Sequence, residues 1–170
     1  MATHEISIGP DGCVPDSTGS VYFQPLDVCT GITNDVFKHI VAVFDDVVDT
    51  KLYGRFVVPQ NYVGTPVFKF AWTSDNGVNT GNVVLGLAYR TVGGDDTTSL
   101  DQATAEESLT VTDAAPGTDN FRLIPTVAAA ANFAAGETVQ FIISRTPTSG
   151  SDTMAARVLL VDMIFQYADA

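Results

Sequence analysis

The chain has 170 residues, of which 45% are hydrophobic and only 16% are charged, and its formal net charge is −12. This length suits one domain with a single core, and the composition excludes a chain that is mainly disordered. Nucleic-acid binding through phosphates needs a basic face, which eight Lys and Arg residues cannot easily build, and an anionic membrane surface is disfavoured for the same reason.

The first 19 residues predict an extended N-terminal arm, which we separate from a domain over residues 20–170. Five Gly or Pro residues interrupt this segment, and no apolar periodicity survives in it. Such an arm is ordered only when a partner binds it, so we expect it to dock on neighbouring subunits or on a larger assembly. The sequence shows no secretory signal and no apolar run of membrane-spanning length.

Residues 20–170 predict one all-β domain. Nine extended segments separated by turns follow one another at residues 20–24, 36–44, 52–58, 66–73, 82–92, 107–112, 120–127, 137–146 and 157–168. Phe68, Phe70 and Trp72 occupy every second position, as in a strand that buries one face, with Lys69 on the other face. The last segment is apolar on both faces, which predicts cover by a second sheet on one side and by a neighbouring subunit on the other.

A polar stretch, residues 93–107, divides these segments, and a short helical turn is predicted over Leu100–Glu106 with Ser99 as its N-cap. About eight strands with loops of uneven length favour a jelly-roll β-sandwich. An immunoglobulin-like sandwich is the alternative, but its Cys…Trp…Cys order is absent because Trp72 follows both cysteines. A protein made in a reducing cytoplasm would keep Cys13 and Cys29 as free thiols, and a disulfide between them is the alternative.

Side chains suited to catalysis are sparse. His4 and His39 are the two histidines, so a metal site with several His or Glu ligands is not predicted, and His39 is expected to be half-buried and hydrogen-bonded. The four Glu residues lie in the arm, in loops or at strand starts, which leaves no carboxylate pair of the kind that glycosidases use: Glu5, Glu106, Glu107 and Glu137. Asp162, an acid deep inside a strand pattern, is expected to pair with an arginine.

The acidic loops are only a weak indication of a metal-binding site. A calcium site is conceivable where oxygen ligands gather, but we favour solvated turn acids that accept local hydrogen bonds at Asp45, Asp46, Asp49, Asp95 and Asp96. The sequence contains no nucleophile elbow, no P-loop and no dinucleotide fingerprint. We therefore predict no catalytic, cofactor-binding or metal-binding residue, no cofactor, and a protein that is not an enzyme.

Five segments of the chain resemble tailed-phage virion proteins. They are RFVVPQNYVGTPVFKFAWTS at residues 55–74, GNVV at 81–84, TVTDAAPGT at 110–118, FAAGETV at 133–139 and the ending VLLVDMIFQYADA. The similarity covers about residues 36–170. It implies a small jelly-roll structural protein of a phage particle, and within that group most closely a trimeric capsid decoration (cement) protein.

This resemblance implies binding at capsomer junctions on the outer capsid surface. The expected partners are the major capsid protein and further copies of the chain, in a homotrimer, with no nucleic acid and no membrane. The alternative is a tail-associated or carbohydrate-binding jelly-roll module that recognises a receptor, in which Tyr53, Tyr62 and Trp72 could supply stacking surfaces. The alternation around Trp72 argues that it faces the core. A small hydrolase ranks last because the acid pair is missing.

Overall fold

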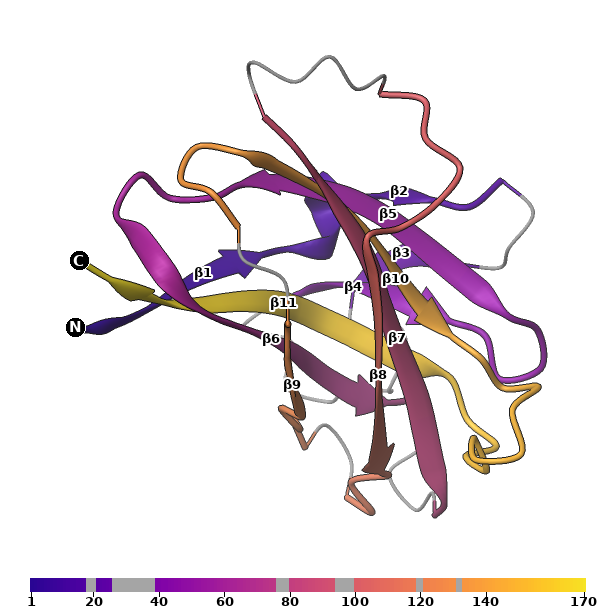
Figure 1. Cartoon of the computed structure of the whole chain (residues 1–170). Helices are drawn as coiled ribbons and strands as arrows, with labels where there is room; N and C mark the ends of the chain where they lie inside the picture. The colour runs from indigo at the N-terminus through magenta and orange to yellow at the C-terminus, as the bar shows by residue number, and fades with distance from the viewer. Residues whose placement is uncertain (18–20, 26–38, 76–79, 94–99, 119–120, 131–132) are drawn as a thin grey trace.

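The computed structural model describes residues 1–17, 21–25, 39–75, 80–93, 100–118, 121–130 and 133–170. Within these ranges the chain forms strands and one short 3-10 helix, which build two antiparallel sheets (Figure 1). The elements are β1 (Thr3–Ile8), η1 (Pro10–Gly12), β2 (Val14–Pro15), β3 (Tyr22–Pro25), β4 (Ile40–Phe44), β5 (Thr50–Val57), β6 (Tyr62–Ser74), β7 (Asn82–Val92), β8 (Glu107–Ala114), β9 (Thr126–Ala128), β10 (Thr138–Arg145) and β11 (Val158–Asp169). The all-β prediction is confirmed, and each of the nine expected segments overlaps a strand.

Nested antiparallel pairs define the sandwich as a jelly roll. β7 pairs with β8, β6 with β9, β5 with β10, and β4 with β11. One sheet has the order β3-β4-β11-β6-β9, with β1 also on β11, and the other has the order β2-β5-β10-β7-β8. A chain that folds back at its middle and then rolls up places its strands in this way, so the eight-strand jelly roll expected from the sequence is confirmed. Among the described residues, no helix has the length and apolar character that a bilayer crossing requires.

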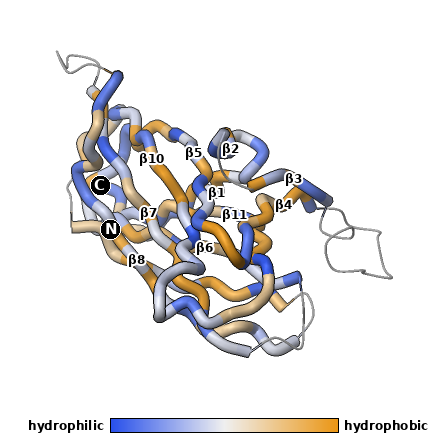
Figure 2. The backbone as a smooth tube through the Cα atoms, turned by 90° about the vertical axis from the view of Figure 1, so that its right-hand side faces the viewer, coloured by the Kyte–Doolittle hydropathy of each residue, from blue (hydrophilic) through white to orange (hydrophobic). Residues whose placement is uncertain are grey.

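The core between the two sheets is rich in aromatic rings. Phe68, Phe70 and Trp72 are fully buried, which confirms the face predicted for β6, while Lys69 points the other way and pairs with Glu5. The Trp72 indole N–H donates to a carboxylate oxygen of β8, Asp113 Oδ2, at 3.0 Å, and so joins the two sheets. Figure 2 shows hydrophobic stretches gathered on the strands, with hydrophilic stretches toward the loops.

The N-terminal segment is part of both sheets. β1 runs antiparallel to β11, with Thr3 opposite Ala168 and Ile8 opposite Met163, and β2 then pairs with β5 in the other sheet. This differs from the expected arm that only a partner orders. The short period-2 run in β1 turns Ile6 and Ile8 to the core, which is why the segment packs on its own chain. The boundary expected between residues 19 and 20 lies outside the described residues.

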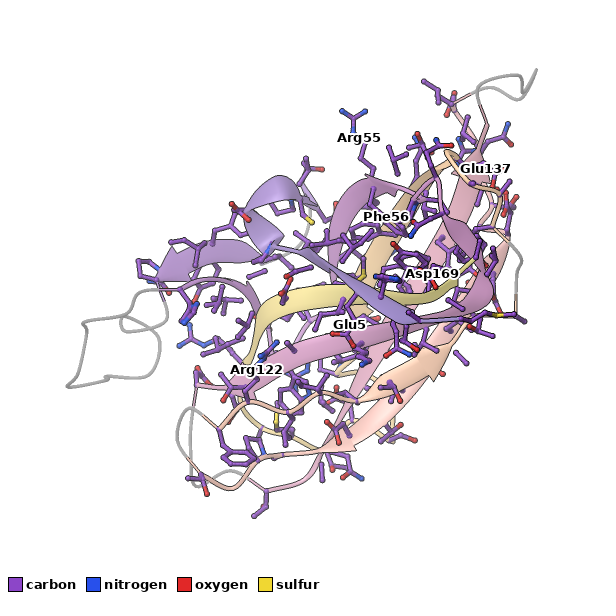
Figure 3. The ribbon with its side chains drawn as sticks, turned by 90° about the vertical axis from the view of Figure 1, so that its left-hand side faces the viewer. Glu5, Arg55, Phe56, Arg122, Glu137 and Asp169 are labelled. Carbon is purple, nitrogen blue, oxygen red and sulfur yellow. The ribbon has the colours of Figure 1, made fainter. Side chains whose placement is uncertain are left out.

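The two ends of the chain are held together by hydrogen bonds. The Ala2 N–H donates to Asp169 Oδ1 at 2.7 Å, and His4 Nε2 lies 2.8 Å from Asp169 Oδ2. The hydrogen bond from His4, and then that from the Ala2 backbone, hold the pKa of the Asp169 carboxyl below its ordinary value. The His4 ring also stacks on Tyr167, with 5.5 Å between ring centroids. Figure 3 shows Asp169 and Glu5 on this side of the molecule.

Both faces of β11 are buried within one chain. On its outer face Leu159 packs with Val41 and Val43 of β4, and all three side chains are fully buried. The helix η1, whose Pro10 is buried, packs against β4 and β11. The apolar pattern of β11 is thus covered at Leu159 by the chain itself and does not by itself require a neighbouring subunit, so the homotrimer stays a prediction.

A buried arginine ties two loops, the turn after β4 and the segment between β10 and β11, to the end of β10. All five N–H groups of Arg145 are used: two donate to the Asp152 carboxylate at 3.0 and 3.1 Å, and the others to the carbonyls of Asp45, Met154 and Ala156. Asp152 Oδ2 also accepts the backbone N–H of Val84 at 3.0 Å. The segment between β10 and β11 is thus fixed against β7 and against the turn that follows β4.

Replacing Phe70 by alanine tests the core. Because this side chain is fully buried between the sheets, Phe70→Ala should lower the free energy of unfolding by about 3–5 kcal/mol. Lys69→Ala on the outer face removes a partly exposed ion pair and should change it by about 1 kcal/mol or less. Urea denaturation followed by tryptophan fluorescence measures both, and equal effects would contradict the placement of these two side chains.

Deleting residues 2–15 tests whether the N-terminal segment belongs to the sandwich. The deletion removes β1, η1 and β2 and uncovers apolar side chains of β4 and β11, so the truncated chain should unfold at a markedly lower urea concentration or fail to fold. Asp11→Asn leaves the three elements in place and serves as the control. If the truncated chain had unchanged stability, the N-terminal segment would be dispensable for folding, as expected from the sequence.

Candidate functional site

The outer face of the five-stranded sheet carries the candidate site, and the register of β10 between β5 and β7 places its side chains in rows. Two adjacent rows consist of Arg55, Gln140 and Arg90, and of Tyr53, Ile142 and Ala88. The alternation of strands brings these positions outward because their sequence neighbours, such as Phe56, Phe141 and Tyr89, are buried in the core. Figure 3 shows Arg55 projecting from the surface, away from Phe56.

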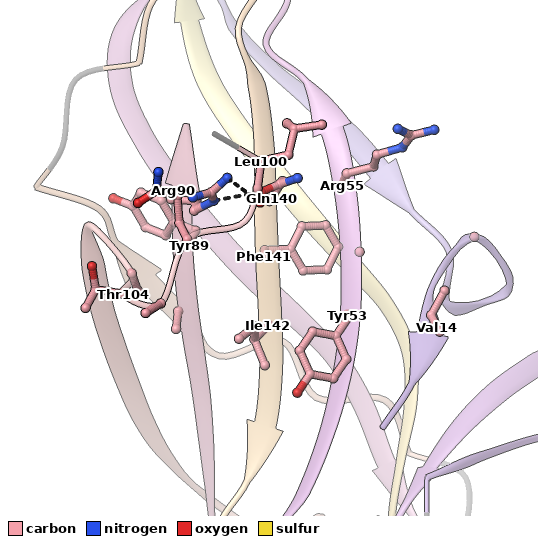
Figure 4. A pocket seen from close by; sticks show the side chains of 16 residues that line it. Val14, Tyr53, Arg55, Tyr89, Arg90, Leu100, Thr104, Gln140, Phe141 and Ile142 are labelled. Atoms are coloured by element: carbon pink, nitrogen blue, oxygen red, sulfur yellow. Dashed lines mark hydrogen bonds between the residues drawn. The ribbon is translucent and has the colours of Figure 1, made fainter. Parts of the chain in front are cut away.

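A pocket of about 650 Å³ lies over these rows, and Figure 4 shows it from close by. Its floor is the sheet, and residues 100 and 102–105 line one of its sides, with Gly12 and Val14 beside β5. Tyr53 is 37% exposed there, so its ring is available to a ligand. The other aromatic candidates from the sequence are placed differently, because Trp72 is fully buried and Tyr62 is 8% exposed in the core.

The segment that lines the pocket is held to β7 by hydrogen bonds. Arg90 Nη2 donates to the Leu100 carbonyl at 2.9 Å, and the Glu106 N–H donates to the Tyr89 carbonyl at 2.9 Å. Glu106 Oε1 accepts the Thr91 N–H at 3.1 Å. Residues 100–106 form no helix, so the predicted helical turn is wrong there, and its expected cap Ser99 lies outside the described residues.

The polar row contains a fixed pair and an exposed cation. Arg90 Nε donates to Gln140 Oε1 at 2.7 Å (Figure 4). Since the amide oxygen of Gln140 faces Arg90, its NH₂ group faces the Arg55 side of the row. The guanidinium of Arg55 is exposed and has no ion-pair or hydrogen-bond partner among the described residues. Together these side chains present N–H donors to the space beside the Tyr53 ring.

The floor of the pocket depends on a glycine. A Cβ atom at Gly54 would lie 2.2 Å from the ring of Phe141 and 2.8 Å from Cys13 Sγ, so only glycine leaves room for both side chains. Burial, and to a smaller extent the charge of Asp11, raise the pKa of the Cys13 thiol to about 11, so this free thiol is neutral and acts in packing. Cys29, the second cysteine of the sequence, lies outside the described residues.

The histidines and Asp162 lie elsewhere, on the six-stranded sheet. His39 is exposed and precedes β4, so the half-buried strand position expected for it is wrong. A β-bulge between Leu160 and Asp162 turns Asp162 toward a hollow of about 520 Å³ that Arg122 also lines. The Asp162 carboxylate accepts a hydrogen bond from Ser7 and forms no ion pair with an arginine among the described residues, in contrast to the expectation.

The acidic turn after β4 forms local hydrogen bonds. Asp45 Oδ1 accepts the backbone N–H groups of Val47 at 2.7 Å and Val48 at 3.0 Å, as expected of a turn acid. In the part of the chain that the structure describes, no group of three or more His, Cys, Asp or Glu side chains is placed to hold a metal ion. Asp95 and Asp96 lie outside that part.

Sequence reasoning missed Arg55, Arg90 and Gln140. Each one alternates with buried residues on a predicted strand, so its outward direction was visible in the sequence. The three side chains share one row because β10 pairs in register with β7 and β5, which lie about 50 and 85 residues earlier. A single sequence does not predict that register.

Comparisons with known proteins concern the fold. No family model and no curated protein matches the chain. Among solved structures, the chain is similar to a CBM35 module from Paenibacillus barcinonensis, with 13% identity, a TM-score of 0.47 and 97% and 98% of the two chains covered. It is also similar to a family 11 carbohydrate-binding module from Clostridium thermocellum in complex with a mixed-linked tetrasaccharide, with 6% identity, a TM-score of 0.48 and 97% and 96% covered.

A third similar structure is the enzymatically active domain of tailspike protein 4 from bacteriophage CBA120. It has 10% identity and a TM-score of 0.46, and the match covers 91% of this chain and 19% of the tailspike chain. Similarities of this size leave the ligand and the role of this chain to be argued from its own residues.

Substituting Gly54 tests the floor of the pocket. Gly54→Ala forces the Phe141 ring and the Cys13 side chain to move, and such overpacking should lower the free energy of unfolding by about 1–3 kcal/mol. Gly12→Ala is the matched control, because a Cβ there meets nothing within 4 Å. Equal melting temperatures for the two variants would contradict the tight contact at Gly54.

Proposed function

We propose that the chain is a non-catalytic carbohydrate-binding module whose ligand lies on the outer face of the five-stranded sheet. The observation that carries the proposal is the pocket in which the exposed ring of Tyr53 lies next to a row of planar polar side chains. A sugar presents an apolar C–H face and a rim of hydroxyl groups. An aromatic ring beside planar hydrogen-bonding groups matches both features.

The shape of the site supports a ligand that lies along the sheet. Ala88 and Ile142 share the row of Tyr53, and the small side chain of Ala88 keeps this part of the floor low beside the ring. A strand rises about 3.3 Å per residue, so the two rows are roughly 7 Å apart. One sugar unit can therefore contact the apolar row while its polar groups reach Gln140.

Binding is favoured over catalysis by the kind of groups present. The titratable side chains that line the described part of the pocket are Tyr53, Tyr89, Arg55 and Arg90. The described lining includes no carboxyl, imidazole or thiol side chain, so these groups orient a ligand more readily than they act as an acid and base pair. The Tyr89 hydroxyl in addition donates to Glu107 and is buried.

Removing the Tyr53 ring tests the proposal. The full chain should bind a subset of glycans on an array, and Tyr53→Ala should weaken that binding about 10–100-fold because the stacking surface is lost. Tyr53→Phe keeps the ring and should retain most of the affinity. Tyr22→Ala is the matched control, because Tyr22 is also 37% exposed but lies on β3 in the other sheet.

Isothermal titration with the best glycan measures these affinities, and circular dichroism checks that each variant is folded. Equal losses for Tyr53→Ala and Tyr22→Ala would contradict a site on this face. An array on which no glycan binds would contradict the function itself.

A structural role in a phage particle is a second candidate, and the resemblance of residues 36–170 to tailed-phage virion proteins is what favours it. In that role the chain would bind the major capsid protein at capsomer junctions on the outer surface, as a homotrimer that adds stability. Such a role depends on buried area between proteins. Capsids that lack the protein should then take it up from solution, and failure to co-sediment with them would remove this candidate.

A further inference from the structure

The pocket over the five-stranded sheet is positively charged in an acidic protein. Among the described residues that line it, the charged side chains are Arg55 and Arg90. The outward positions of β5, β10 and β7 add a third cation, Lys51, and include no Asp or Glu. The whole chain has 20 acidic and eight basic residues, so this face departs strongly from the average.

The polar row formed by Arg55, Gln140 and Arg90 presents mainly donors, whereas Gln102, Thr104 and the Tyr53 hydroxyl, which also line the pocket, can accept as well as donate. The amide NH₂ of Gln140 faces the Arg55 side because its oxygen is used by Arg90, and the Arg55 guanidinium is exposed and unpaired among the described residues. A neutral sugar hydroxyl donates as well as accepts, so a site for neutral sugars profits from side-chain acceptors. A ligand that only accepts, such as a carboxylate, fits a row of N–H donors better, and its bonds to arginine are charge-assisted.

We infer that the ligand is an acidic saccharide whose carboxylate binds Arg55 and the amide of Gln140 while its ring lies on Tyr53. This inference rests on the proposed carbohydrate-binding function and specifies its ligand class. Arg90 is a positioning residue: through its hydrogen bonds to Gln140 and to the Leu100 carbonyl it fixes the direction of the Gln140 amide and the segment beside the pocket.

The negative charge of the rest of the molecule favours a short anionic ligand over a long polyanion such as a nucleic acid. A nucleic acid carries a charge every few ångströms and gains affinity only where many basic groups meet it. Here the cationic positions cover one face of three strands, and the net charge of −12 repels a long polyanion beyond it. A saccharide with spaced carboxylates avoids that repulsion.

An array of neutral and uronate-bearing oligosaccharides, probed with the full chain, is the first test. We expect the bound glycans to carry a carboxylate. Binding of neutral glycans alone would overturn this inference and leave the proposed function standing, whereas binding of none would contradict the proposed function. A single-stranded oligonucleotide bound as tightly as the best acidic glycan would overturn the inference in favour of nucleic acid.

The second test compares the best acidic glycan with its methyl ester, which keeps the sugar and the linkages but removes the charge. In isothermal titration the ester should bind about 10–100-fold more weakly, as expected for loss of a hydrogen bond to a charged group. Arg55→Gln should weaken binding of the acid to a similar extent and leave the ester nearly unchanged. Equal affinities of the intact chain for acid and ester would overturn the inference.

Arg122→Gln provides the matched control. It makes the same change of net charge at an exposed arginine that lies away from the pocket. The neighbouring residue, Leu123, forms a β-bridge with Trp72 of the six-stranded sheet. We expect this variant to bind the acidic glycan as the unmodified chain does. If Arg122→Gln weakens binding as much as Arg55→Gln, the effect comes from overall charge, and a specific contact at Arg55 is excluded.

Discussion

The unbroken pairing of β10 with β5 on one side and β7 on the other is the constraint on which the candidate site depends. All eight residues of β10 have partners on both strands without a bulge. Because side chains alternate along a strand, a slip of one residue would bury Gln140 and Ile142 and expose Phe141. The same register therefore builds the core on one face and the polar and apolar rows on the other, and neither can change alone.

The end of β10 is fixed by the fully buried pair of Arg145 and Asp152. Removing two charges from water costs several kcal/mol, and the attraction between them offsets this only when every donor and acceptor is satisfied. Here the guanidinium donates all five N–H groups, two to the Asp152 carboxylate and three to backbone carbonyls. The pair holds the segment that returns the chain from β10 to β11, because the carboxylate and two of the three carbonyls that bind Arg145 belong to that segment.

How much could be predicted from the sequence differs between elements. The alternation of Phe68, Phe70 and Trp72 gave both the strand and its buried face, since period-2 burial is a local property. The sequence did not predict that β1 is a strand of the sandwich. Its six residues are followed closely by Gly and Pro residues, and its pairing partner, β11, lies about 160 residues later in the chain. Tyr53 was a candidate by residue type alone. Its separation from buried Tyr62 and Trp72, and its place beside Gln140 and Arg90, required the register between distant strands.

The nested pairing also determines how the floor and one wall of the candidate site are built. The connection between β7 and β8 closes the innermost pair, so its length and sequence can vary without moving any other strand pair. Its described residues 100 and 102–105 line one side of the pocket, and Arg90 and Glu106 hold the segment to β7. The floor of the site is thus set by the pairing that holds the sandwich together, while one wall belongs to the connection between β7 and β8. The proposed ligand specificity therefore depends on residues 100–105 and on the outward positions of three strands, while the core depends on the inward positions of the same strands.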